Sequence, residues 1–428
     1  MRRTGLLVLA LTVSLQAQEV RRAVPLGPEA PVPSIPIGVS FDETAKYLAG
    51  FPISGTSSLA QAQQEAAYRT HATKFESMWA RYNEYYFSRM RAWSLAELSP
   101  RLNTTLPVIY FFGGPDALAP LALYPMAPDF ILGGLEPVGN LPAVEAMDSA
   151  RRLAALEGLR ASTDVILSFG HFITKEMKEE LARTEFQGVL PLLLTFLAMK
   201  GDEVVDVAFF GIGPDGQQKE FGLAPASGPG ILPGVRVAFR SGPGAPVRRL
   251  HYVQANVADD VLRSNAALLT WASGFGTGNM YFKAASYLLH EAYFSTIRTF
   301  LLERAASVLQ DDSGMPLRFF QGGSWRLWFF GSYSGTLDLF RKYYQPELAQ
   351  AFATGAAPLP FGTGYKWRVG ESNLLLAVKQ TILRAEPVMV APVAAPTAAP
   401  LATPAAFPRR ASEGTLDPGT SVPIPIAQ

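Results

Sequence analysis

The chain has 428 residues, 48% of them hydrophobic and only 17% charged, and it contains no cysteine. This composition excludes a disulfide framework, a thiol nucleophile and a thiolate metal site, so stability has to come from a packed core. The formal charge of +1 provides no basic surface for nucleic acid or anionic lipid, and we expect neither as a partner.

The first 17 residues are predicted to be a cleaved secretory signal. Arg2 and Arg3 form a basic start, and the apolar run 5–15 is shorter than the roughly 20 residues of a bilayer span. The small residue Ala17 then precedes polar residues, as at a cleavage site. We therefore expect a periplasmic or extracellular protein without a transmembrane segment in its mature chain, in which residues 18–40 form a Pro-rich spacer.

Residues 41–100 are predicted to be a helical lead-in packed on the core, with one long helix over 57–93. Large apolar residues recur there at steps of three and four, namely Phe75, Met78, Trp79, Tyr82, Tyr85, Tyr86 and Met90. This spacing is typical of one face of a helix that packs on a core. An exposed platform for stacking sugars is the alternative.

Residues 101–386 are predicted to form an α/β domain with a mixed β-sheet flanked by helices, because strand-like and helical segments alternate. Strands are expected at 108–112, 129–132, 204–211, 235–240, 250–257, 317–320 and 325–330. Helices are expected at 142–159, 175–184, 189–199, 260–273, 282–290, 293–309, 336–344 and 372–383. A short sequence similarity between residues 111–116 and 209–215 suggests, as an alternative organisation, that the domain consists of two packed halves.

Two acidic residues follow the first two predicted strands. Asp116 comes after Gly113 and Gly114, and Glu136 comes after a second pair of glycines. Ligands of open α/β sheets bind beyond the carboxyl ends of the strands, and glycines there let a ligand approach the backbone. If the two strands are parallel neighbours, both carboxylates lie at one edge and can serve as acid and base. The alternative is that Asp116 is a turn residue and Glu136 caps a loop.

A second acidic cluster contains Asp311, Asp312 and Ser313, which we expect at the C-terminus of the helix over 293–309, with Gly314 as its stop residue. Because acidic residues are unfavourable at that end of a helix, helix stability does not explain them. Local turn hydrogen bonds are one explanation, and binding of a cation or a polar ligand is the other. The four histidines lack the spacing of a zinc protease, so we predict no metal site and no cofactor.

The last segment, 387–428, is predicted to be a disordered tail rich in Pro and Ala. Prolines recur at every fourth position from Pro392 to Pro408, which favours polyproline II. A spacer through an envelope layer and a docking strip for a protein partner are the alternatives.

Several segments of the chain resemble a family of uncharacterised exported bacterial proteins. The similar segments are Gly-Pro-Asp at 114–116, Gly-Leu-Glu-Pro-Val-Gly at 134–139, Lys-Ala-Ala-Ser-Tyr-Leu at 283–288 and Gln-Asp-Asp-Ser-Gly at 310–314. The resemblance implies bacterial export and a shared fold, and it draws attention to the two acidic clusters. It implies no particular reaction.

Three hypotheses follow for function. The leading one is an exported cell-envelope protein that acts by binding, as an accessory protein. The second is a cysteine-free hydrolase of an envelope component that uses Asp116, Glu136, Asp311 and Asp312 as acid, base or metal ligands. The third is a structural scaffold.

Overall fold

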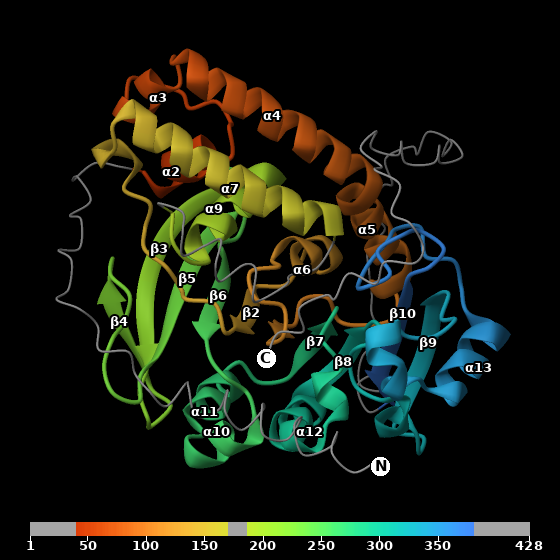
Figure 1. Ribbon diagram of the computed structural model, residues 1–428. Coiled ribbons are helices and arrows are strands. Elements are labelled where there is room, and N and C mark those ends of the chain that lie inside the picture. The colour runs from red at the N-terminus through yellow and green to blue at the C-terminus, as the bar shows by residue number, and fades with distance from the viewer. Residues whose placement is uncertain (1–39, 170–185, 381–428) are drawn as a thin grey trace, which may run out of the picture. The chain divides into compact units, whose positions relative to one another are not determined.

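The structure, a computed structural model, describes residues 40–169 and 186–380. The predicted signal, the Pro-rich spacer up to residue 39, the helix at 175–184 and the C-terminal tail lie outside the described residues. Within them, the predicted α/β class is confirmed, because helices lie on both faces of a ten-stranded mixed sheet (Figure 1).

The strands of the sheet follow the order β4-β3-β5-β6-β2-β1-β7-β8-β10-β9. Their bounds are β1 (Val108–Tyr110), β2 (Asp129–Gly134), β3 (Glu203–Ile212), β4 (Gln218–Gly222), β5 (Leu232–Arg240), β6 (Arg248–Gln254), β7 (Gly278–Phe282), β8 (Ala305–Gln310), β9 (Trp325–Gly331) and β10 (Asn373–Lys379). The central strands β6, β2, β1, β7 and β8 run parallel, whereas the pairings outside them are antiparallel.

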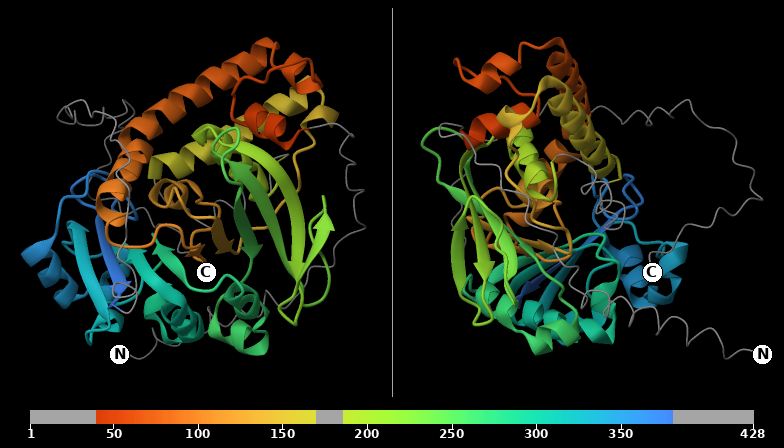
Figure 2. Two further views of the ribbon diagram at one scale, coloured as in Figure 1. Left: turned by 180° about the vertical axis from the view of Figure 1, so that it is seen from behind. Right: turned by 60° about the vertical axis from the view of Figure 1, so that its left-hand side comes forward.

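Two layers of helices cover the sheet. One face carries α2 (Phe41–Leu48), α3 (Ser58–Ala62), α4 (Ala66–Tyr82), α5 (Ser88–Trp93), α6 (Leu118–Leu123), α7 (Ser149–Phe169) and α9 (Leu190–Lys200). The other carries α10 (Asp259–Ser264), α11 (Ala267–Ser273), α12 (Ser295–Arg304) and α13 (Pro346–Gly355). Figure 2 shows α4 and α7 from behind, running along the same side of the sheet. Among the described residues, no helix combines the length and apolar character that crossing a bilayer requires.

Alternate residues of the central strands pack into two separate apolar cores, one on each face of the sheet. Val108 and Tyr110 of β1 point into the core beneath α4, α6 and α9, whereas Ile109 belongs to the core beneath α10 to α12. Since both faces of the strand are buried, β1 is apolar throughout and shows no polar alternation.

The helix expected over 57–93 is divided in the structure. After α3 and α4 the chain forms a π-helical turn at Asn83–Phe87, then α5, then a second π-helical turn at Ser94–Leu98. The side chains of Phe75 and Met90 are buried at 1% and 3% exposure. Met78 and Tyr82 are buried too, and the partly buried Trp79 and Tyr86 pack against the same core, so most of the stripe packs on the core.

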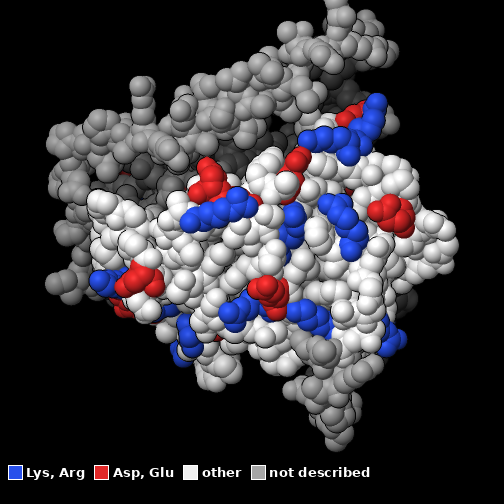
Figure 3. All heavy atoms as spheres, turned by 90° about the horizontal axis from the view of Figure 1, so that it is seen from below, with Lys and Arg blue, Asp and Glu red and all other residues white. Residues whose placement is uncertain are grey.

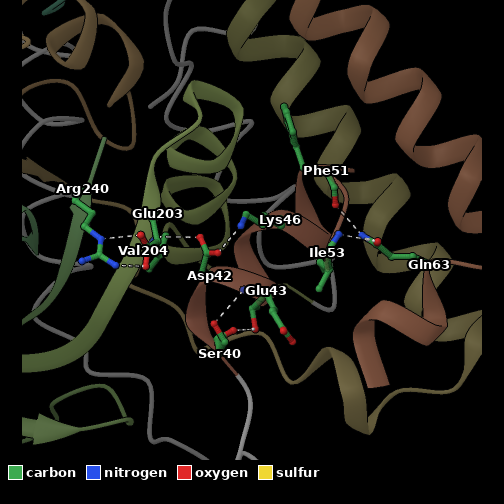
Figure 4. Close-up of polar contacts among 11 residues, drawn as sticks. Ser40, Asp42, Glu43, Lys46, Phe51, Ile53, Gln63, Glu203, Val204 and Arg240 are labelled. Carbon is green, nitrogen blue, oxygen red and sulfur yellow. Dashed lines mark hydrogen bonds and ion pairs between the residues drawn. The ribbon is translucent and has the colours of Figure 1, made fainter. Parts of the chain in front are cut away.

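Polar contacts join α2 to the antiparallel side of the sheet (Figure 4). Ser40 caps the helix by accepting a hydrogen bond from the amide of Glu43. Asp42, in the first turn, accepts a hydrogen bond from the amide of Val204 in β3 at 3.1 Å. The preceding residue of β3, Glu203, pairs with Arg240 of β5, which ties the helix to two strands.

Several predicted elements in the C-terminal half are wrong. The predicted helix over 293–309 is a 3-10 turn at Ala292–Phe294, then α12, then strand β8, and the one over 372–383 contains β10. The helix over 282–290 is the end of β7, a loop and a 3-10 turn at Leu288–His290. The strand at 317–320 and the helix at 336–344 are 3-10 turns, Leu317–Phe320 and Asp338–Tyr343. In the N-terminal half, the helix expected over 142–159 is a 3-10 turn at Val144–Ala146 followed by α7 from Ser149. β8 was missed because every residue in it is buried, and a strand buried on both faces has no alternation to distinguish it from a helix.

The connections that leave β1 and β7 diverge at the centre of the sheet. β1 leads through α6 to β2 on one face, and β7 leads through α12 to β8 on the other. β1 and β7 are parallel neighbours, so the carboxyl ends of these two strands form a topological switch point. Open α/β sheets bind ligands at such points.

Candidate functional site

A pocket of about 150 Å³ lies at this switch point. The loops that follow β1, β2, β6 and β7 line it, together with Phe294 just before α12. β1 and β2 are parallel neighbours with Val108 opposite Phe130, which confirms that Asp116 and Glu136 follow strands that end at the same edge. Both residues, with Gly113 and Gly114, line the pocket.

Glu136 is buried at 2% exposure in the wall of the pocket. The hydroxyl of Tyr252 lies 2.9 Å from the backbone carbonyl oxygen of Glu136 and 3.3 Å from its Oε2 atom, so its single proton can be donated to either. Among the described residues, no Lys, Arg or His forms an ion pair with it. Glu136 is thus a buried carboxylate that lacks a protein cation.

The glycines at this edge make room for side chains of the chain itself. A Cβ atom on Gly134 would lie 2.3 Å from Glu136 Oε2, and one on Gly114 would lie 3.1 Å from the same atom. A Cβ atom on Gly113 would lie 2.2 Å from the ring of Tyr110. Gly113 and Gly114 therefore line the pocket while clearing space for Tyr110 and Glu136.

Asp116 forms a buried ion pair with Lys283, which follows β7. Lys283 Nζ lies 2.6 Å from Asp116 Oδ2, and each side chain is 5% exposed. The hydroxyl of Tyr110 lies 3.2 Å from Asp116 Oδ2 and 3.3 Å from the carbonyl oxygen of Lys283, so it can donate to either. The sequence pattern does not identify Lys283 as a site residue, because it predicts a helix over 282–290. The feature that could have identified it is a lysine directly after Gly278–Phe282, which forms the buried strand β7.

The loop after Lys283 has an unusual backbone. Ala284, Ser286 and Tyr287 have φ values of 50°, 51° and 55°, and they are the only non-glycine residues with positive φ in the described chain. A left-handed conformation costs a residue with a side chain roughly 1–2 kcal/mol. Three such residues within four positions require strong support from the surrounding structure.

The second acidic cluster provides that support. Asp311 Oδ2 accepts a hydrogen bond from the amide of Ala284 at 2.8 Å, and Ser313 Oγ accepts one from the amide of Ala285 at 2.7 Å. Asp312 accepts a hydrogen bond from the hydroxyl of Tyr287. The segment 311–313 therefore holds the loop that carries Lys283.

The position expected for this cluster is wrong. Asp311 and Asp312 follow the carboxyl end of β8 and not the C-terminus of a helix. Asp311 is buried at 2% exposure, and its Oδ1 atom accepts hydrogen bonds from the amide and the hydroxyl of Ser313. Burial and the neighbouring Asp312 raise the pKa of Asp311. These residues act at the back of the loop, and none of the three lines the pocket.

The tyrosine Tyr365 closes the other side of the loop. Its hydroxyl accepts a hydrogen bond from the amide of Ser286 at 3.1 Å and lies 2.8 Å from Ser286 Oγ. It also donates to the carbonyl of Ala284 at 3.0 Å. Burial raises the pKa of Tyr365 to about 12, so the hydroxyl remains protonated and can donate.

In residues 40–169 and 186–380, no three His, Asp or Glu side chains gather in a way that could hold a metal ion. Acidic and basic side chains are mixed on the face seen from below in Figure 3, and its described part has no extended patch of one sign.

We compared the chain with protein-family models, with curated proteins and with solved structures, and none of them matches.

Proposed function

We propose that this protein is an exported cell-envelope protein that binds a small polar ligand in the pocket beyond β1, β2 and β7. One observation carries the proposal: three buried charged side chains, Asp116, Glu136 and Lys283, reach one pocket from three different loops. The export part of the proposal is supported by the basic and apolar leader at residues 1–17.

Energetics supports a functional role for these charges. Burying an ionised group costs several kcal/mol. A protein with a buried ion pair is often less stable than one with well-packed apolar residues of the same volume in its place. Lys283 also lies next to a loop with three left-handed residues. Folding alone favours neither feature, and both are typical of sites where the structure serves binding or catalysis.

The volume of the pocket limits the ligand. Pockets for drug-sized molecules measure about 300–1,000 Å³. At about 150 Å³, this pocket fits a molecule of a few heavy atoms, or one end of a larger molecule.

A matched pair of tryptophan variants tests the binding function. Leu135 lines the pocket and is 45% exposed, whereas Leu223 is 46% exposed and does not line it. We expect small polar compounds to raise the melting temperature of the wild type and of Leu223→Trp, but not of Leu135→Trp. A ligand at 100 times its Kd should add about 2.7 kcal/mol. If no compound stabilises the wild type, or if Leu135→Trp responds equally, the binding proposal is wrong and a scaffold role is favoured.

The export part needs its own measurement. We expect the chain expressed with its leader in a bacterium to be recovered outside the cytoplasm, with a new N-terminus near residue 18 by mass spectrometry. Recovery in the cytoplasm with Met1 or Arg2 at the N-terminus would contradict export.

A second candidate function is hydrolysis of an envelope component. The observation that favours it is that Asp116 and Glu136 line the same pocket from adjacent parallel strands. In this role Glu136, which has no protein cation, activates a water molecule, and Asp116 is held in place by Lys283. Turnover of a cell-wall glycoside, peptide or ester that is lost in Glu136→Gln, while circular dichroism shows the variant folded, would support hydrolysis, and no turnover of any of them by the wild type would contradict it.

A further inference from the structure

We infer that the ligand of this pocket carries a positively charged nitrogen, such as a primary ammonium group, which binds against Glu136. The inference rests on the proposed binding function and adds to it the chemical class of the ligand.

The charges that line the pocket do not balance. Asp116 and Glu136 are acidic, Lys283 is basic, and the other lining residues are uncharged, so the wall has one excess negative charge. Lys283 is already 2.6 Å from Asp116, which leaves the excess charge on Glu136. A buried carboxylate without a nearby cation is costly, and a cationic ligand would supply the missing charge.

Glu136 also has unused hydrogen-bonding capacity. A carboxylate accepts up to about four hydrogen bonds. Among the described residues, the hydroxyl of Tyr252 is the only donor near this carboxylate, at 3.3 Å from Oε2, and its single proton can go instead to the backbone carbonyl of Glu136 at 2.9 Å. No hydrogen bond from the described residues reaches Oε1. An ammonium group has three N–H donors and can form charge-assisted hydrogen bonds, which are stronger than neutral ones.

Two aromatic rings that line the same pocket provide an independent argument. Phe112 and Phe294 both line the pocket, and their ring centroids lie 6.1 Å apart. The face of an aromatic ring attracts a cation, and aromatic walls are a recurrent feature of sites for organic ammonium groups. Neither ring offers a hydrogen bond to an anionic or strongly polar group.

An organic cation fits this wall better than a metal ion. Ca²⁺ needs six to eight oxygen ligands, and Mg²⁺ needs near-octahedral coordination. The Asp116 carboxylate already pairs with Lys283, so the pocket offers few oxygen ligands for either ion. The Lys283 ammonium would also repel a divalent ion placed between the two carboxylates. An ammonium group needs only Glu136 and the aromatic wall.

Three compounds of nearly equal size test the inference by calorimetry: ethanolamine, ethylene glycol and glycolate. They carry a positive charge, no charge and a negative charge. We expect ethanolamine to bind wild-type protein at least tenfold more tightly than ethylene glycol, and glycolate to bind least well. Glu136→Gln should reduce the preference for ethanolamine over ethylene glycol to less than threefold, whereas Glu157→Gln, an exposed control on α7, should leave it unchanged.

A second variant keeps the test decisive if Glu136→Gln does not fold. Phe112→Leu retains an apolar side chain and removes one ring, so it should weaken ethanolamine binding more than ethylene glycol binding. If ethylene glycol or glycolate binds as tightly as ethanolamine, and Leu135→Trp abolishes that binding, the pocket binds ligands but the inferred cation is wrong. Absence of ethanolamine binding, alongside pocket binding of other compounds in the wider screen, would also overturn the inference. If no compound binds at all, the binding function itself fails.

Discussion

Removal of the Lys283 ammonium group should be one of the most destabilising single changes in the pocket. Lys283 Nζ lies 2.6 Å from Asp116 Oδ2, and both side chains are 5% exposed. In Lys283→Met the Asp116 carboxylate would remain buried, with only the hydroxyl of Tyr110 at 3.2 Å beside it. Breaking a buried pair by removing one partner typically costs 3–5 kcal/mol, so we expect the free energy of unfolding to fall by about 3–5 kcal/mol.

A double-mutant cycle separates this effect from the loss of packing. Asp116→Asn should also destabilise the protein, because it leaves Lys283 buried without a counter-charge. The double variant Asp116→Asn/Lys283→Met leaves no unpaired charge, so it should cost about 2 kcal/mol less than the sum of the single variants.

Urea unfolding followed by circular dichroism gives the free energy of unfolding of the wild type, the two single variants and the double variant. The slope of the unfolding free energy against urea concentration should be the same in each, which shows that only stability has changed. Arg341→Met is the control, because Arg341 pairs with Asp338 on the surface at 79% and 94% exposure and its loss should not change stability measurably. A loss below about 1 kcal/mol in Lys283→Met, with additive effects in the cycle, would refute the argument that the pair is buried and coupled.

Three further predictions concern the loop, a glycine and a buried histidine. Ala284→Gly should stabilise the protein by about 1 kcal/mol because φ is 50° there, whereas Ala285→Gly, at a buried position with negative φ, should destabilise it by about 1 kcal/mol; equal losses in chemical denaturation would contradict the strain argument. Gly134→Ala should cost about 2 kcal/mol and weaken ligand binding, because its Cβ atom would lie 2.3 Å from Glu136 Oε2; unchanged stability and affinity would show that the carboxylate can move aside. Burial lowers the pKa of His71 to about 4, so the folded state favours the neutral ring, and its contribution to stability is complete above pH 6.5 and lost as pH falls towards 4. His71→Gln should remove about 3 kcal/mol of this pH dependence, and an unchanged pH profile of the unfolding free energy would contradict it.

Local sequence patterns were sufficient for one half of the site. The apolar runs before Gly113 and Gly133 predict strands β1 and β2, and the acidic residues after them lie at the same edge because the strands are parallel neighbours. These signals lie within a few residues of each other in the chain, so a sequence pattern carries them.

The other half was hidden by an ambiguous pattern. The apolar residues Phe294, Ile297 and Leu301 have helical spacing because they lead into and form α12, and Ala305 and Val308 continue that spacing although they belong to β8. Burial on both faces removes the alternation that would have marked the strand. The aspartates that follow were therefore expected at a helix end.

By itself, the sequence determined the α/β class, the thiol-free core and the two acidic segments, because these depend on composition and on short-range periodicity. Only the tertiary structure decided that Lys283 neutralises Asp116, that the segment 311–313 supports the left-handed loop, and that Glu136 is left without a cation. These relationships join residues far apart in the chain. These contacts form because the order of the parallel strands brings the ends of β1, β2, β7 and β8 to one edge of the sheet. No local sequence pattern encodes that order.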